Sequence, residues 1–222
     1  RPRTVTGMTT TPALDETAAR TRFSGVVGVL GGEAELLRAY GLAHRSTQTP
    51  VTTDTRFGTA SGSKTMTAVV VLSLVAEGRL ALDTLARDLL GDDLPLVDDA
   101  VTVRHLLTHT SGIGDYLDEE ELEEGDYVLR RPVHEYLTTK DFLPDLDGHP
   151  QAFSPGERFT YCNSGYVVLA LLAERAASRG YHDLVRTRVL EPAGMSDSGF
   201  FRGDALPART ATGYLGVDDD AL

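Results

Sequence analysis

Ser61 and Lys64 stand three residues apart in the stretch Ser-Gly-Ser-Lys, at the start of an apolar run. Lysine is rare in this chain, because only Lys64 and Lys140 among its 21 basic residues are lysines. Residues three apart share one face of a helix, so the Ser61 hydroxyl and the Lys64 amine are expected to point the same way. A desolvated lysine releases its proton more easily and can act as a base toward a hydroxyl, whereas arginine stays protonated. The pair predicts a nucleophilic serine activated by a lysine.

The position of Ser61 favours the same chemistry, and Ser63 is its rival. Ser61 is expected in the first turn of a helix, where backbone N–H groups and the helix dipole favour a developing oxyanion. Ser63 lies about 100° round the helix from Lys64. The plainer interpretation is a capping serine followed by a surface lysine; with 11 serines in the chain, a random Ser-x-x-Lys has odds of roughly one in ten.

Tyr161 and Asn163 form a second candidate pair, where another helix is expected to begin. Asn163 is the only asparagine of the chain. The plainer interpretation is an N-cap, a position that asparagine prefers. A random Tyr-x-Asn has a chance of about 4%, and both motifs together are a coincidence of roughly 0.4%. Their joint occurrence favours one catalytic constellation.

Two histidines and a cysteine have plainer explanations than chemistry. His105 and His109 have the i, i+4 spacing of metal ligands, but Leu106 stands where a zinc peptidase needs glutamate, so structural histidines are expected. Cys162 is the only cysteine and has no evident partner base, which predicts a packed bystander. A single cysteine permits no intrachain disulfide. No metal and no other cofactor are expected.

Other enzyme classes lack their motifs in this chain. It contains no Gly-x-Ser-x-Gly elbow, no Gly-x-Gly-x-x-Gly and no Walker loop, which argues against an α/β-hydrolase, a dinucleotide enzyme and an NTPase. The net charge of -12 argues against nucleic acid as a partner. Most of the excess negative charge falls in residues 115–126, which hold eight acidic residues; a solvated loop or helix face is expected there, with a calcium or cationic-partner site as the alternative.

A hairpin and several helices are expected to position the candidate residues. The pattern predicts a short helix over 13–22 and strands over 23–30 and 34–43, joined by a Gly-Gly turn. A helix is expected over 61–78, and it is apolar on nearly every face, so we expect it to be buried on all sides. Further helical segments are predicted within 79–95, 102–116, 131–139, 163–180 and 181–195.

The chain of 222 residues is 41% hydrophobic, enough for a sizeable core. We predict two parts, an N-terminal helix and hairpin in 1–60 and a mainly helical region in 61–222. The longest apolar run, 68–76, is too short to span a bilayer. No apolar signal region is present at the N-terminus, which favours an intracellular over an exported protein.

These motifs and their surroundings resemble the serine beta-lactamase and penicillin-binding protein superfamily, in its class C-like branch. That branch holds class C beta-lactamases, D-alanyl-D-alanine carboxypeptidases, D-aminopeptidases and esterases, and Ser-x-x-Lys marks the wider superfamily. The resemblance covers about residues 23–214. The matching segments, in the order of the family, are DTRFGTASGSKTMTA, EGRLALD, VRHLLTHTSGI, SPGERFTYCNSGY, VLEPAGMSDSGF and TATGY.

The resemblance implies a role for each matching residue. Ser61 would be the acylated nucleophile, with its backbone N–H as half of the oxyanion hole, and Lys64 would help to remove its proton. Tyr161 would act with Lys64 as base and acid, and Asn163 would bind Lys64 or the amide side chain of the substrate. The implied fold is α/β (α+β), with an N-terminal hairpin of an antiparallel sheet and a large helical region.

The third motif of the family, Lys or His followed by a variable residue and Gly, is missing. No lysine follows Asn163, and His182 is followed by Asp183. In the family that motif lies on a C-terminal strand that supplies the other oxyanion N–H. The hairpin would also keep unpaired edges without further strands. We therefore hypothesise that the C-terminal strands come from a second chain, were cut away, or lie outside this sequence.

Together these observations predict a serine hydrolase that forms an acyl-enzyme on a beta-lactam, a D-amino-acid peptide or a carboxylic ester. The expected partner is a small-molecule acyl substrate. The alternative is a non-catalytic, penicillin-binding-like module or an inactive truncated remnant, which the missing third motif favours.

Overall fold

The computed structural model describes residues 11–31, 34–117, 129 and 131–214. Its chain divides into a smaller unit, whose described residues lie within 1–58 and 206–217, and a larger unit, whose described residues lie within 59–205. Paired strands build the smaller unit, and helices build the larger one.

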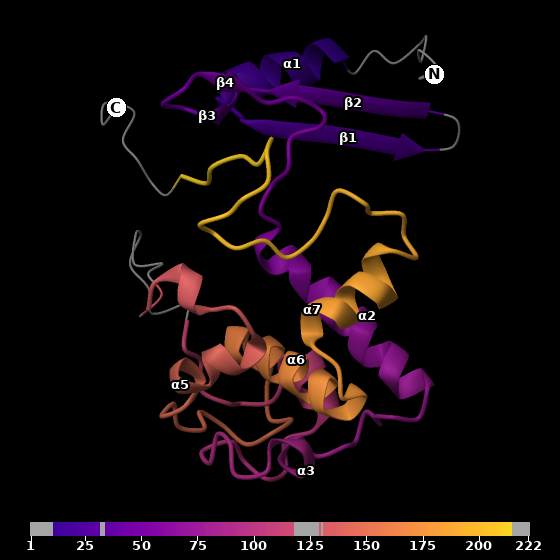
Figure 1. The fold of residues 1–222 in the computed structure, drawn as a ribbon, viewed down its shortest axis with the longest axis vertical. Coiled ribbons are helices and arrows are strands. Elements are labelled where there is room, and N and C mark those ends of the chain that lie inside the picture. Colours follow the sequence, from indigo (N-terminus) through magenta and orange to yellow (C-terminus); the bar gives the residue numbers. More distant parts are fainter. Residues whose placement is uncertain (1–10, 32–33, 118–128, 130, 215–222) are drawn as a thin grey trace. The chain divides into compact units, whose positions relative to one another are not determined.

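The smaller unit combines one helix with an antiparallel hairpin. Helix α1 (Thr11–Arg20) is followed by β1 (Gly25–Gly31), which pairs in register from end to end with β2 (Ala34–Tyr40) (Figure 1). The predicted hairpin is confirmed, although Gly32 of its Gly-Gly turn lies outside the described residues. Alternating side chains on such a pair face opposite ways, so one face can pack while the other meets solvent.

The predicted strand over 34–43 is interrupted at Gly41, after which a second small strand pair begins. Gly41 has φ +69°, and a Cβ there would lie 2.1 Å from the Ser24 hydroxyl oxygen. Positive φ and this close approach both require glycine. The chain then forms β3 (Leu42–His44), which pairs antiparallel with β4 (Thr49–Pro50).

A segment from late in the sequence also belongs to the smaller unit. The Arg56 N–H donates to the Arg209 carbonyl at 2.7 Å, and the Ala211 N–H donates to the Arg56 carbonyl at 2.8 Å. These bonds form a parallel bridge beside the strands. The division of the chain after residue 60 stays a prediction.

The larger unit contains the helices that carry the candidate site. None of its described helices is long and apolar enough to cross a membrane. In chain order the elements are η1 (Ala60–Gly62), α2 (Ser63–Ala76), α3 (Ala86–Leu90), α4 (Val103–Leu107), η2 (Val133–Glu135), η3 (Thr139–Phe142), α5 (Leu143–Leu146), α6 (Asn163–Ala177), α7 (Tyr181–Val185) and the π-helical turn η4 (Arg186–Leu190).

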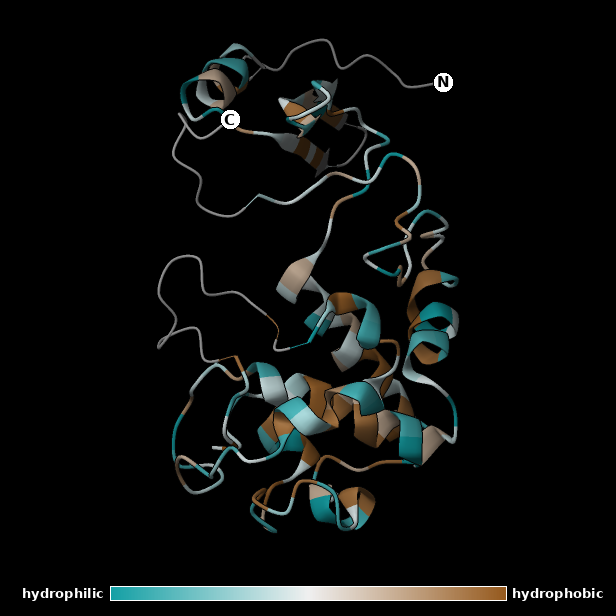
Figure 2. Cartoon of the chain, turned by 60° about the vertical axis from the view of Figure 1, so that its left-hand side comes forward, coloured by the Kyte–Doolittle hydropathy of each residue, from teal (hydrophilic) through white to brown (hydrophobic). Residues whose placement is uncertain are grey.

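The packing of α2 against α6 forms the centre of the larger unit. Val70 and Leu74 of α2 and Leu169 and Leu172 of α6 are completely buried. Burying each such side chain contributes roughly 1.5–3 kcal/mol. Figure 2 shows apolar residues gathered along these central helices, with hydrophilic residues toward the outside. This core holds the N-terminal ends of α2 and α6 in a fixed relation.

The expectation that α2 is buried on all sides is wrong for one face. Val69 and Leu72 are 43% and 47% exposed, while Val70 and Val71 are fully buried. A helix that is apolar all round carries no pattern to show which face its neighbours cover. The described residues cover only one side.

Three predicted helices are shorter than expected. The helix within 102–116 is only α4, because His109 adopts φ +55° and turns the chain away. The segment 131–139 holds only the short turn η2, since Pro132 precedes it and Thr138 caps the next turn. The third, 181–195, is α7 followed by the π-helical turn η4. The helix within 163–180 is confirmed as α6, which ends at Ser178 with φ +51°.

Candidate active site

The site begins at the turn that leads into α2. Ala60 has φ +43°, a left-handed conformation that costs an alanine on the order of 1–2 kcal/mol. Ser61 follows in the turn η1 and is exposed, whereas Lys64 in the first turn of α2 is half-buried. Ser63 donates its hydroxyl proton to the Ala60 carbonyl at 2.7 Å. Ser63 is thereby bonded to its own turn and not to Lys64.

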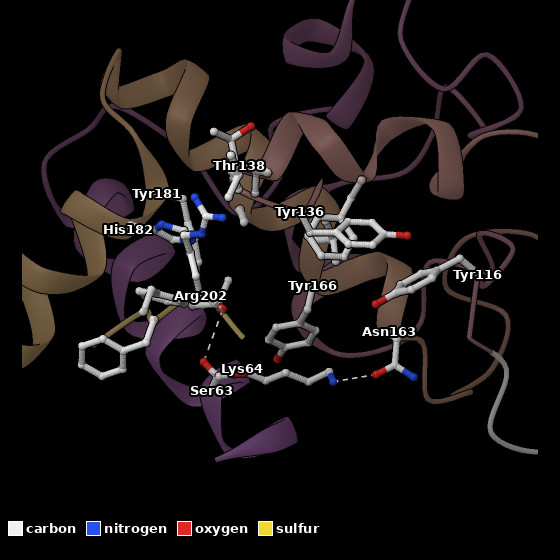
Figure 3. A pocket seen from close by; sticks show the side chains of 18 residues that line it. Ser63, Lys64, Tyr116, Tyr136, Thr138, Asn163, Tyr166, Tyr181, His182 and Arg202 are labelled. Atoms are coloured by element: carbon white, nitrogen blue, oxygen red, sulfur yellow. Dashed lines mark hydrogen bonds between the residues drawn. The ribbon is translucent and has the colours of Figure 1, made fainter. Parts of the chain in front are cut away.

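The four residues of the two predicted motifs lie together. Lys64 Nζ donates to Ser61 Oγ at 3.0 Å, and Tyr161 Oη donates to the same oxygen at 2.7 Å. Lys64 Nζ also donates to Asn163 Oδ1 at 2.7 Å, a bond that Figure 3 shows. Residues about a hundred positions apart therefore meet around one hydroxyl. Both acceptors of the Lys64 amine, the Ser61 hydroxyl and the Asn163 amide, are neutral groups.

Aromatic rings surround the Lys64 ammonium. Its Nζ lies 4.8 Å from the centroid of the Tyr161 ring and 5.9 Å from that of Tyr166. The face of an aromatic ring attracts a cation at such distances. Figure 3 shows Lys64 extending from α2 toward Asn163 with the Tyr166 ring beside it. The amine is held in one position, within reach of Ser61.

Asn163 is placed by the way α6 begins, and it is not the N-cap. Cys162 caps the helix, with its Sγ accepting the Gly165 N–H at 3.4 Å. Asn163 is buried, and its Nδ2 donates to the Leu117 carbonyl at 2.9 Å. With the Leu117 carbonyl as an acceptor on one side and the Lys64 amine as a donor on the other, the amide has a single orientation. The plainer interpretation of Asn163 as a cap is wrong.

Asp115 is a residue that the sequence interpretation missed. Its carboxylate accepts the backbone N–H of Asn163, and it accepts both the backbone N–H and the hydroxyl of Ser164, at 2.9 and 3.0 Å. A carboxylate at a helix N-terminus satisfies unpaired N–H groups and favours the helix dipole. Asp115 is thus not part of a solvated acidic stretch, and residues 118–126 of that stretch lie outside the described residues.

His109 is a second residue that the sequence interpretation assigned only a general structural role. Its Nδ1 accepts the Cys162 N–H at 3.1 Å, and its ring stacks on the ring of Tyr161 with centroids 4.6 Å apart. His105 has a different place, because its Nδ1 accepts the Thr102 N–H in the capping box of α4. Within the described ranges no group of three or more metal-ligating side chains occurs.

Cys162 is buried, and its protonated thiol is unsuited to attack a substrate. Burial raises the pKa of its thiol to about 12, and the nearby Asp115 carboxylate adds to this rise. A thiol is nucleophilic only as the thiolate, so Cys162 stays protonated and inert near neutral pH. The prediction of a packed bystander is confirmed, with the added role of capping α6.

A cavity of about 620 Å³ adjoins Lys64 and Asn163. It lies over α2 and α6, and aromatic side chains make up much of its wall (Figure 3). The Thr139 hydroxyl on this wall is buried and has no hydrogen-bond partner among the described residues. The phenylalanine and tyrosine residues of the lining are Tyr116, Tyr136, Phe142, Tyr166, Tyr181, Phe200 and Phe201. Such a cavity suits a large apolar group with a polar atom.

Comparison with known proteins decides the family. The family model described as Beta-lactamase matches residues 12–222. The chain belongs to the beta-lactamase family. Esterase EstB from Burkholderia gladioli is 36% identical over 211 residues, which are 90% of this chain and 52% of the esterase. The chain spans about half the length of the curated relatives it matches.

Solved structures of this family show the same fold. A penicillin binding protein from Bacillus halodurans has a TM-score of 0.82 at 37% identity, over 93% of this chain and 63% of that structure. The D-amino acid amidase from Ochrobactrum anthropi SV3, complexed with L-phenylalanine amide, has a TM-score of 0.72 at 28% identity, over 91% of this chain and 55% of that structure. The predicted mixed α/β fold is confirmed, and the chain covers part of it.

Proposed function

We propose that the chain carries the acylating centre of a serine hydrolase that acts on a carboxylic ester, a D-amino-acid amide or peptide, or a beta-lactam. The observation that supports this most is the Ser61 hydroxyl oxygen, which accepts hydrogen bonds from Lys64 at 3.0 Å and Tyr161 at 2.7 Å. Relatives and structural neighbours in this family include an esterase and a D-amino acid amidase.

The reaction would proceed in two steps. Ser61 Oγ attacks the carbonyl carbon and loses its proton to Lys64 or Tyr161, whichever is deprotonated, giving a tetrahedral oxyanion. When the oxyanion collapses, the bond to the leaving group breaks and that group takes the proton. In the second step a water attacks the acyl-enzyme, and the same pair carries its proton back to Ser61.

The backbone N–H of Ser61 is the proposed first donor of the oxyanion hole, since it lies at the start of the helical segment. We propose that a second donor lies on a strand outside these 222 residues, in continuing polypeptide or in another chain. This proposal is supported by the coverage of the relatives and by the missing basic-x-Gly motif.

The cavity beside Lys64 supports a bulky apolar substituent on the substrate. Its volume of about 620 Å³ exceeds what a methyl or ethyl group fills. Burying one aromatic ring in such a site contributes roughly 2 kcal/mol or more through its apolar area. The Thr139 hydroxyl, which has no hydrogen-bond partner among the described residues, would donate a hydrogen bond to a polar atom of that substituent or accept one from it.

Labelling and turnover test the proposal together. The wild-type chain and Ser61→Ala, each together with the polypeptide that supplies the second oxyanion donor, are treated with a fluorophosphonate probe and then assayed on nitrophenyl esters, D-phenylalanine nitroanilide and a chromogenic cephalosporin. We expect the wild type to be labelled at Ser61 and to turn over at least one substrate, with neither in the variant. A Ser61→Ala chain that keeps full hydrolysis would refute the role of Ser61.

A second candidate, a penicillin-binding-like module without turnover, is favoured by the missing third motif. It predicts stable labelling of Ser61 and no product release. Mass spectrometry of the chain over time after addition of a nitrophenyl ester or the chromogenic cephalosporin separates the two. An enzyme returns to its unmodified mass as the acyl group is hydrolysed, whereas the acyl adduct of a module without turnover persists.

A further inference from the structure

His109 holds the chain on both sides of Tyr161. Its carbonyl accepts the Thr160 N–H at 2.9 Å, and its ring Nδ1 accepts the Cys162 N–H at 3.1 Å. Because Tyr161 lies between these two donors, one residue fixes the backbone immediately before and after it. The direction of the Tyr161 side chain therefore depends on His109.

The ring of His109 also fixes the plane of the phenol. It lies between the rings of Tyr161 and Tyr166, with centroid distances of 4.6 and 5.0 Å and interplanar angles of 28° and 29°. Tyr166 is itself anchored, since its hydroxyl donates to the Leu107 carbonyl at 3.0 Å. At the other end of this stack of rings, the Tyr161 hydroxyl donates to Ser61 Oγ. The arrangement runs without a gap from the end of α4 to the nucleophile.

The backbone of His109 adopts an uncommon conformation to make these contacts. Its φ of +55° is left-handed, a region that few residues other than glycine occupy and that histidine, asparagine and aspartate enter more often. Such strained residues concentrate at functional sites, where surrounding contacts hold them. Here the contacts are those to the segment that carries Tyr161.

Only the neutral ring can accept at Nδ1. With Nδ1 as acceptor, the neutral ring carries its proton on Nε2. A second proton would bind at Nδ1, so two hydrogen-bond donors, the Nδ1–H and the Cys162 N–H, would face each other. Burial and the Lys64 charge lower the pKa of His109 from its ordinary value, and Asp115 opposes them. The titratable groups that face the ring from each neighbouring element are Lys64 of α2, Asp115 after α4, Tyr161 and Cys162 before α6, and Tyr166 of α6.

We propose that His109 is a positioning residue for Tyr161 and serves as one only while its imidazole is neutral. The proposal rests on the proposed function of Ser61 and Tyr161. Protonation removes the bond to Cys162 and brings a second cation toward Lys64, so the Tyr161 hydroxyl loses its alignment with Ser61. Activity is present at neutral pH and is lost as the pH falls through the lowered pKa of His109.

Two substitutions separate the acceptor from the ring. His109→Phe keeps a stackable ring and removes the acceptor, and we expect kcat to fall by about 10- to 100-fold with KM changed less than about threefold. His109→Asn keeps an acceptor oxygen near the Nδ1 position, tolerates positive φ and cannot titrate between pH 4 and 8. We expect His109→Asn to retain the kcat of the wild type within about fivefold. On the acidic side of its pH–rate profile, the acid limb, the fall in activity caused by protonation of His109 should be missing.

His105→Asn is the matched control, because His105, in the helix α4 that precedes His109, also accepts a backbone N–H at Nδ1, from Thr102. It should keep the acid limb of the wild type. The pH profiles of kcat and kcat/KM from pH 4 to 8 and thermal unfolding are measured for the four chains. If His109→Phe does not fold, the profile of His109→Asn decides alone.

The outcomes distinguish this role from the proposed function. If the wild type is labelled and active but His109→Phe has the same kcat, or His109→Asn keeps the wild-type acid limb, the positioning role is overturned and the hydrolase function stands. If the wild type, with the second oxyanion donor supplied, is neither labelled at Ser61 nor active, both are overturned.

Discussion

The two units of the chain differ in what they bury. In the larger unit, long side chains such as Leu74, Leu169 and Leu172 are completely covered. In the smaller unit, the described apolar residues that are buried are all small: Ala18, Ala43 and Val51. Long hydrophobic side chains of the hairpin, such as Leu37 at 42%, stay exposed. A two-stranded hairpin is marginal by itself and gains stability from further strands or helices.

This difference shows which unit can hold side chains in a fixed geometry. The four motif residues Ser61, Lys64, Tyr161 and Asn163 all belong to the larger unit, at the ends of helices whose middles form its core. A well-packed core resists displacement, so it can hold a hydroxyl and an amine in hydrogen-bond contact. The hairpin carries none of these residues.

The largest effect is expected from Lys64, which belongs to the well-packed unit. Lys64→Arg and Lys64→Ala should both lower kcat/KM by about 1,000-fold or more, because arginine keeps the charge but does not exchange its proton. Lys140→Arg, at an exposed lysine, is the control and should change little. Ester hydrolysis at pH 7.5 measures all three. Substantial activity in Lys64→Arg would contradict the role of Lys64 as a base.

Core truncations compare the two units directly. Leu74→Ala in α2 removes a completely buried side chain and should lower the free energy of unfolding by about 2–5 kcal/mol. Leu37→Ala removes a side chain that is 42% exposed and should cost less than about 1 kcal/mol. Denaturant unfolding of each variant measures the difference. Equal costs would show that the hairpin is packed as tightly as the helices.

A smaller effect is expected where α6 begins. Asp115→Asn keeps the shape of the side chain but weakens three hydrogen bonds to Asn163 and Ser164, which should cost about 1–2 kcal/mol and lower kcat by about 10-fold.

The matched control for Asp115 is Asp99→Asn, since Asp99 pairs with Arg87 and its side chain is 86% exposed. It should change the free energy of unfolding by less than about 0.5 kcal/mol. If the two variants behave alike, Asp115 does not support the site.

The smallest effect concerns Cys162. Because burial raises the pKa of its thiol to about 12, the folded chain should react with iodoacetamide at pH 8 far more slowly than the denatured chain. The raised pKa applies only while the larger unit is folded, so the rate also reports local opening around Tyr161. Mass spectrometry counts the adduct. Rapid alkylation of the folded chain would show that the start of α6 opens readily.

Local spacing was sufficient to predict that Lys64 meets Ser61, whereas the approach of Tyr161 and Asn163 was expected from the joint occurrence of the two motifs and from the family resemblance. Ser61 and Lys64 share a face because they are three apart on a helical segment, and this relation needs no tertiary contact. The rarity of lysine and asparagine in the chain marked Lys64 and Asn163. The hairpin was likewise predictable from its Gly-Gly turn between two apolar runs.

Tertiary relations were not predictable in this way. Asp115 lies 48 residues before Asn163, and nothing in its acidic surroundings distinguishes it from a solvated carboxylate. The left-handed turn at His109, which ends α4 early, follows from its bonds to the segment around Tyr161. The uncovered face of α2 depends on which neighbours pack there, and an apolar pattern cannot specify that.

The scarcity of lysine also makes the chain a spectroscopic reporter. Reductive methylation with ¹³C-formaldehyde would label two side chains, Lys64 and Lys140, besides the α-amino group. Lys140 is exposed and serves as the internal reference. Lys64 lies beside the rings of Tyr161 and Tyr166, so ring currents should displace its methyl resonance from that of Lys140. A single two-dimensional spectrum would show whether addition of a substrate shifts the resonance of Lys64 while that of Lys140 stays in place.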